Sequence, residues 1–533
     1  MASSGTTLAP EIWDNICAYL TPPSVANLRL ASAAFNNIAL PWKYRSIRLE
    51  AFGPSVERFV SIAKTPNLRN LVREITIDTR VDLDWQHACN ETYPFPLAFM
   101  NALPYLRYFT SVTALHIRFE EHCGNQEEFH YLSLAETYLF RYKVLDTIFH
   151  CAAGLWTLEK QLKIDEELDE ERGVDGSDQD EDADEWDKKC DYSDQDVDFH
   201  GSCFALRELT ISNLADYADS DISDSKAWKT IMALPTLVDF KLFVTAQDDE
   251  AAPENEVYFI ERYEFFDSLP TTWLTLNMSQ NLRVLSLYFK DYWGWLPTMH
   301  FRDYGHDSPF PQLKVLALGN YVFSHEWQVD WFPMIGKENG SGGLEELYLD
   351  DCPILYHARQ TAVGDDGYPD YLAIVRARSD EYNPQEHDFH LRWHTVLSQW
   401  KDQMKGLKVF RMGHGSWWGM TPRTFDLISN DPDYKDVDRN VLDHRLSYNT
   451  HRTFACPAPL HENSQPEMWR HGAGLDDERN TRMKYIDYDI GLGPSPWLEQ
   501  DGVFEPEEGT AEKDEIAWCA LTSSLMSRAF ILT

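Results

Sequence analysis

Basic residues are scarce in this sequence. Lys and Arg total 47 against 87 Asp and Glu, a net charge of −40 over 533 residues. A protein that binds nucleic acid needs a basic face, because neutralising phosphates supplies most of its affinity. The acidic balance therefore argues against nucleic acid or an anionic membrane surface as a partner.

Several sequence signals of localisation and metal binding are also missing. The nine cysteines are odd in number and form no C-x-x-C pair, so neither a disulfide framework nor a zinc ribbon is indicated, and we expect no bound metal. No run approaches the roughly 18 to 20 apolar residues of a membrane span, and the first residues lack the basic and apolar regions of a secretory signal. We therefore expect a cytoplasmic and/or nuclear protein without a membrane partner.

Catalytic motifs are missing in the same way. The chain has no G-x-x-x-x-G-K phosphate loop, no G-x-S-x-G elbow, no H-E-x-x-H and no G-x-G-x-x-G after a predicted strand. The aromatic content of 13% is better explained by core packing than by a ligand site. We expect a protein that is not an enzyme, with no catalytic residues and no cofactor.

The first fifty residues carry a clear helical pattern. Apolar residues recur every four positions from Leu8 through Ile12 and Ile16 to Leu20, which predicts one stripe of a helix. Pro10 fits its first turn, and Thr21-Pro22-Pro23 ends it and begins a second helix that contains Val25 and Leu28. Two or three short helices in about 40 residues need a neighbour or a partner to stay folded.

This segment resembles an F-box. The family's opening Leu-Pro-x-Glu-Ile corresponds to Leu8-Ala9-Pro10-Glu11-Ile12, with the proline one place later, and its Leu-x-x-Leu-Arg to Val25 through Arg29. The resemblance implies docking on the Skp-type adaptor of a cullin-based (SCF) ubiquitin ligase. The residues that it assigns to the adaptor are Leu8, Pro10, Ile12, Ile16, Leu20, Val25 and Leu28.

A second pattern, apolar-x-x-apolar-x-apolar, recurs after residue 65. Its copies begin at Val72, Val112, Leu206, Leu237, Leu282, Leu313, Leu344 and Leu407. Three intervals between successive copies are 31 residues long: from 206 to 237, from 282 to 313 and from 313 to 344. The register and the completed L-x-x-L-x-L-x-x-C at Cys352 favour leucine-rich repeats over unrelated amphipathic strands. An F-box followed by such degenerate repeats resembles the substrate receptors of fungal F-box families.

The structure of the remaining segments is predicted from their amino-acid composition. Residues 165 to 198 hold 18 Asp or Glu and three basic residues, which predicts a disordered acidic insertion. An EF-hand in this stretch is disfavoured, because the glycine and closing glutamate of such a loop are missing. Residues 416 to 533 read as a loop-rich extension with a terminal helix after Glu512.

The expected fold class is α/β, with an N-terminal helical F-box followed by an irregular leucine-rich-repeat solenoid. The expected domains are an F-box at 1–50, a solenoid at 51–415 with the disordered acidic insertion at 165–198, and a loop-rich C-terminal extension at 416–533.

The expected function is the substrate-recognition subunit of an SCF-type E3 ubiquitin ligase, with a Skp-type adaptor, a cullin complex and an unknown protein client as partners. Two alternatives stay open, a non-degradative F-box scaffold and an adaptor-independent protein-binding solenoid. Side chains that flank the pattern's last two apolar positions, or lie between them, point away from the core, because strands alternate. They place the client at Lys241, Tyr288, Tyr348 and Arg411, unless inserted loops cover that face and the client meets Trp293, Trp295 or Trp417.

Overall fold

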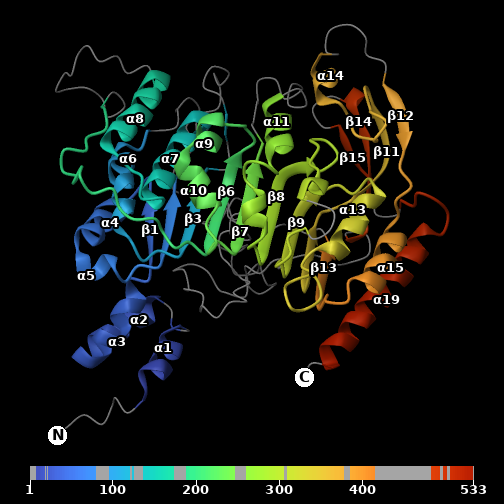
Figure 1. Cartoon of the computed structure of the whole chain (residues 1–533). Coiled ribbons are helices and arrows are strands. Elements are labelled where there is room, and N and C mark those ends of the chain that lie inside the picture. Colours follow the sequence, from blue (N-terminus) through green and yellow to red (C-terminus); the bar gives the residue numbers. More distant parts are fainter. Residues whose placement is uncertain are drawn as a thin grey trace, which may run out of the picture.

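A nine-stranded, all-parallel sheet forms the centre of the molecule (Figure 1). The computed structural model describes residues 8–18, 20, 22–79, 95–120, 123–124, 136–172, 188–246, 260–304, 309–376, 384–413, 482–492, 496–500 and 504–531. The strands lie side by side in chain order, without a reversal. They are β1 (Ser46–Glu50), β2 (Glu74–Asp78), β3 (Ala114–Arg118), β6 (Glu208–Ala215), β7 (Asp239–Thr245), β8 (Val284–Trp293), β9 (Val315–Tyr321), β10 (Glu346–Asp350) and β13 (Val409–Gly413).

The recurring apolar pattern locates eight of these strands. In each copy the last two apolar residues lie inside the strand, as Leu209 and Ile211 do in β6 and Leu285 and Leu287 in β8. Their alternation places them on one face of the sheet, where they are buried. The edge strand β1 has Ile47 and Leu49, but the position three residues before Ile47 is the aromatic Tyr44, so the strand was not among the recognised copies of the pattern.

The expected fold class, a helical F-box followed by an irregular leucine-rich-repeat solenoid, is wrong. The large parallel sheet and the mixed α/β content suggest a Rossmann-like α/β domain instead. The repeated pattern misled because it specifies only which side chains enter the core. A strand of a broad parallel sheet and a strand of a short solenoid turn share the same alternation. Because the strand order never reverses, the sheet lacks the switch-point crevice of doubly wound folds.

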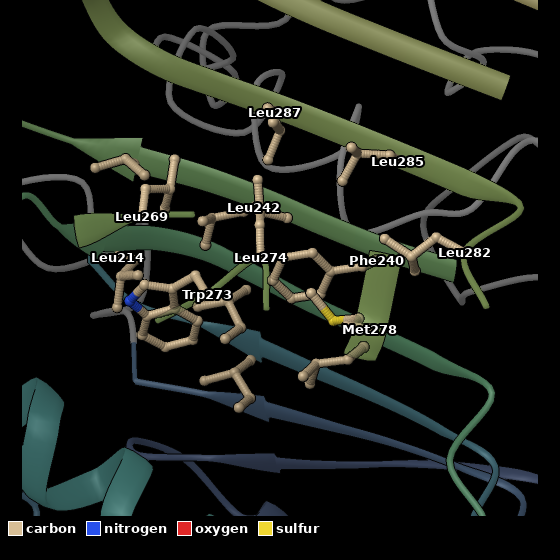
Figure 2. Close-up of a cluster of buried hydrophobic side chains, with 14 of the residues drawn as sticks. Leu214, Phe240, Leu242, Leu269, Trp273, Leu274, Met278, Leu282, Leu285 and Leu287 are labelled. Atoms are coloured by element: carbon tan, nitrogen blue, oxygen red, sulfur yellow. The ribbon is translucent and has the colours of Figure 1, made fainter. Parts of the chain in front are cut away.

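The main core lies between the leucine face of the sheet and the helices that connect the strands (Figure 1). Parallel strands need such crossovers, since the chain must return to the same end of the sheet each time. Figure 2 shows one section, where Phe240 and Leu242 of β7 and Leu285 of β8 meet Met278 and Trp273 of the connection between them. The helices of this layer include α4 (Ser55–Lys64), α6 (Leu97–Ala102), α7 (Tyr138–Ala152), α10 (Lys226–Met232), α11 (Ile260–Ser268), α13 (Glu326–Trp331) and α15 (Trp393–Gln403).

The expected disordered acidic insertion is also wrong for its described residues. Helix α8 (Leu158–Arg172) continues past residue 165, and its Ile164 and Leu168 are buried. Residues 188–204 return along the domain and are held by Arg107, whose guanidinium donates to the backbone oxygens of Asp196 (2.9 Å) and Phe199 (2.7 Å). The amino-acid composition did not predict this ordered structure, because a few buried contacts hold a segment whose other side chains are charged and exposed.

The described residues after 481 correct the expectation of a loop-rich C-terminal region. A second sheet orders its strands as β12 (Gln385–Asp388), β11 (Ile354–Gln360), β14 (Tyr485–Asp489) and β15 (Trp497–Glu499). Helix α19 (Thr510–Ile531) packs along α15. Its Asp514 accepts hydrogen bonds from the His394 backbone (2.7 Å) and the Tyr485 hydroxyl (2.7 Å), and its Arg528 donates to the Met404 oxygen (2.7 Å).

Candidate protein-binding surfaces

Three short helices form the N-terminal part of the described chain, below the sheet in Figure 1. They are α1 (Pro10–Ala18), α2 (Pro22–Ala31) and α3 (Ala33–Lys43), and both the proline at the start of α1 and the Pro-Pro start of α2 follow the expected signals. Ser32 caps α3 by accepting a hydrogen bond from the Phe35 backbone (3.2 Å). The Trp13 ring packs edge-on against Phe35 with centroids 5.0 Å apart, which holds α1 against α3.

An apolar stripe on this bundle remains open to solvent. Leu8, Ile12 and Ile16 are 44%, 46% and 36% exposed, and their spacing of four keeps them on one side of the α1 region. Fully burying such a side chain is worth about 1.5–3 kcal/mol, so covering the exposed part of each is worth about 1 kcal/mol. The stripe therefore supplies a few kcal/mol to a partner that covers it.

The other residues assigned to the adaptor occupy different environments. Leu20 and Leu28 are half-buried, while Val25 is buried inside the bundle. Pro10 is the first residue of α1, and its side chain lies outside the described set. The sequence reasoning missed Leu30, which is 85% exposed. Two helical positions rotate by about 200°, so Leu30 faces away from Leu28, and this out-of-phase apolar residue was the available signal.

The four residues assigned to the client lie on the second face of the large sheet, opposite the leucines. Cα partners run in register from Lys241 through Ser286 and Ala317 to Tyr348 and Arg411. This row crosses the whole sheet, and we call it the middle row. Its members are Arg48, Thr76, His116, Thr210, Lys241, Ser286, Ala317, Tyr348 and Arg411.

The fourth of these residues, Tyr288, lies two positions further along β8 in the neighbouring row, where its Cα partner on β9 is Gly319. Tyr288 and Tyr348 belong to a small buried cluster with Phe243 and Ala317. The Tyr348 hydroxyl donates to Glu346 Oε2 at 2.7 Å, and the Tyr288 hydroxyl to Asp350 Oδ2 at 3.4 Å. The sheet therefore gathers both tyrosines on one face and buries them, whereas exposed anchors were the expectation.

Charged side chains dominate the half of this face nearer β1. Lys241 is fully buried and pairs with Glu208 (Nζ to Oε1, 3.1 Å) and with Asp239. Asp78 pairs with Arg48 and with Arg118, whose Nη1 lies 3.6 Å from Oδ2. Arg411, at the far end of the middle row, is half-buried. The same alternation applied to the copies at Val72 and Val112 would have found Thr76 and His116, which the sequence reasoning left out.

Two of the three tryptophans that were expected as an alternative client contact lie among the described residues. Trp293 and Trp295 are buried, and their indole N–H groups donate to the backbone oxygens of Gly319 (2.7 Å) and Gly367 (2.9 Å). Both therefore act in core packing. Trp417 lies outside the described residues.

Other kinds of site were sought in the same residues. Within the described ranges, no group of three or more His, Cys, Asp or Glu side chains is arranged to hold a metal ion. Among the helices that the structure describes, none combines the length and apolar content needed to cross a membrane. No protein-family model matches the chain, and no curated protein matches it.

Proposed function

We propose that this protein is the substrate-recognition subunit of an SCF-type ubiquitin ligase. Its three N-terminal helices dock on a Skp-type adaptor, and its α/β body binds a protein client. The chain itself is non-catalytic in this scheme, and it supplies proximity between the client and the subunits that transfer ubiquitin.

The observation that carries the proposal is the exposed stripe of Leu8, Ile12 and Ile16. These side chains lie on the segment that resembles an F-box, and they stay open although the bundle has its own interior around Val25 and Ala39. Exposed apolar side chains gathered on one helix face mark protein contacts more often than scattered ones do.

A double substitution of the stripe tests adaptor docking. Ile12→Asp places an acid at the third residue of α1, where the helix dipole favours it, and Ile16→Lys places a base near the end. The two new charges are four residues apart and pair on the helix surface, so the helix itself keeps its stability. We expect binding to a purified Skp-type adaptor to fall at least a hundredfold, because burying two charges costs more than the apolar contact returns.

The matched control changes two exposed apolar residues elsewhere, Leu276→Asp with Ile516→Asp, which are 59% and 63% exposed. The control should bind the adaptor like the unchanged chain, and both proteins should give the same circular dichroism melt. Unchanged adaptor binding by the Ile12 and Ile16 double variant would overturn the proposal.

A further inference from the structure

Ser193 presents its hydroxyl at the surface of the acidic segment. It lies in the stretch of residues 188–204 that returns along the domain, and it is exposed. Its hydroxyl donates to Asp191 Oδ2 at 3.1 Å, and its backbone N–H donates to Asp191 Oδ1 at 2.9 Å. The next residue, Asp194, pairs with Lys64 (Oδ2 to Nζ, 2.9 Å). The segment is therefore anchored beside Ser193 while the serine oxygen stays open to solvent.

The charges around Ser193 form a pattern of the kind that protein kinases select. The sequence from this residue is Ser-Asp-Gln-Asp, so carboxylates stand one and three residues after the serine. The second of them, Asp196, is exposed like the serine itself. Neither Lys nor Arg is among the three residues before Ser193. Because kinases use charge patterns to discriminate between substrates, this pattern fits a kinase whose substrate channel is basic.

We propose that Ser193 is a phosphorylation site for an acidophilic serine kinase, one that selects a carboxylate three residues after the serine. In the transfer, a bond forms between Ser193 Oγ and the γ-phosphorus of ATP, and the bond from that phosphorus to the bridging oxygen of ADP breaks. The hydroxyl proton passes to the base of the kinase, and ADP leaves. The inference does not rest on adaptor docking.

A phosphate at Ser193 also weakens the attachment of this segment. It replaces a hydroxyl donor by a group that carries about −1.5 to −2 charges at pH 7. Because the Ser193 oxygen lies 3.1 Å from Asp191 Oδ2, the new charge stands beside that carboxylate. Lys64 is already paired with Asp194, so it neutralises only part of the added charge. Like charges at this distance repel, and we expect residues 188–200 to open more readily.

Phosphorylation of the full-length chain by a purified acidophilic kinase of the casein-kinase type, with ATP, tests the site. Mass spectrometry of the digested product separates Ser193 from Ser177, which begins the same four residues but lies outside the described ones. Asp196→Asn removes the carboxylate at the third position and keeps the side-chain oxygen that accepts from the Asp198 backbone (3.2 Å). We expect the rate of phosphorylation at Ser193 to fall at least tenfold in this variant.

The matched control is Asp198→Asn, which removes the same charge from another exposed residue two positions further on. The rate of phosphorylation at Ser193 should change by less than twofold in the control. A full-length chain that acquires no phosphate at Ser193, or equal rates in the Asp196→Asn and Asp198→Asn variants, would overturn the inference.

Hydrogen exchange then measures the effect of the phosphate on the segment. The amides of Asp191 and Gln195 donate to Asn101 Oδ1 (2.8 Å) and to the Tyr192 oxygen (3.0 Å). Their protection should fall at least tenfold in the phosphorylated chain. Ser193→Ala removes the hydroxyl without adding charge, so it should change the protection by less than threefold. Equal protection with and without the phosphate would refute the proposed opening of the segment.

The Ile12 and Ile16 double variant keeps this inference separate from the proposed function. Ser193 lies outside the three N-terminal helices, so the double variant should be phosphorylated there at the unchanged rate. Loss of adaptor binding and loss of phosphorylation at Ser193 are therefore distinguishable results.

Discussion

Arg107 offers the sharpest test of how the acidic segment is held. Its guanidinium is buried and donates to the Pro104 oxygen (2.6 Å), Gln195 Oε1 (2.5 Å) and the backbone oxygens of Asp196 and Phe199. The guanidinium also lies 3.9 Å from the centre of the Trp156 ring. Arg107→Met keeps an unbranched chain over the tryptophan and removes all four hydrogen bonds.

The expected cost follows from the acceptors that are left behind. One buried acceptor left unpaired costs about 1–3 kcal/mol, and Arg107→Met leaves two neutral acceptors whose hydrogen bonds were buried, the Pro104 oxygen and Gln195 Oε1. The hydrogen bonds to the Asp196 and Phe199 oxygens are only partly buried, so these two acceptors add less to the cost. We therefore expect the free energy of opening residues 188–200 to fall by about 3–5 kcal/mol.

Native-state hydrogen exchange measures this opening directly. The amides of Asp191, Gln195 and Phe199 donate to Asn101 Oδ1 (2.8 Å), the Tyr192 oxygen (3.0 Å) and the Asp196 oxygen (3.2 Å). Since about 1.4 kcal/mol corresponds to a factor of ten, their protection should fall by about two to three and a half orders of magnitude.

The control for Arg107 is Arg69→Met. Arg69 lies 5.4 Å from the Tyr108 ring, which Arg107 also contacts, but it gives only one hydrogen bond, to the Ala63 oxygen at 3.2 Å. Arg69→Met should change the hydrogen-exchange protection of residues 188–200 by less than tenfold. If Arg107→Met also changes it by less than tenfold, the segment is held by other contacts and the reasoning fails.

Two further predictions concern packing and pH. A Cβ at Gly319 would lie 2.0 Å from Tyr288 Cδ1, so Gly319→Ala should destabilise the fold by about 1–3 kcal/mol in urea titrations, and Tyr288→Ala in the same chain should remove most of that extra cost; additive effects would contradict the clash. Burial, with the charge of Asp169 adding to it, raises the pKa of Asp165 to about 6. Because the folded chain then holds this proton more tightly than the unfolded chain, the associated stability is complete below about pH 4 and about 2–3 kcal/mol is lost as the pH rises through 6. Asp165→Asn should remove that pH dependence relative to the unchanged chain, and identical pH profiles would refute it.

Local sequence patterns predicted the elements that depend on near neighbours. The apolar pairs such as Leu209 with Ile211 lie in strands, and α1 and α2 begin at Pro10 and Pro22, because alternation and helix-start preferences act within a few residues. The same patterns carried no information on how strands pair, so the expected solenoid was wrong. Acidic composition gave the wrong result for residues 188–198, because residues from another part of the chain, Arg107 and Asn101 among them, hold this segment by hydrogen bonds.

The candidate sites show the same distinction between what local sequence patterns determine and what depends on the tertiary structure. The sequence alone determined that Leu8, Ile12 and Ile16 share one helix face, and that Lys241, Tyr348 and Arg411 point to one side of their strands. Only the tertiary structure decided that the first set stays exposed while Lys241 and Tyr348 are buried. It alone also holds the segment of Ser193 in place through Arg107, although Arg107 and its partner Gln195 lie 88 residues apart along the chain. Exposure and adjacency depend on which distant strands pair and what packs over them, and no local pattern of side chains specifies that.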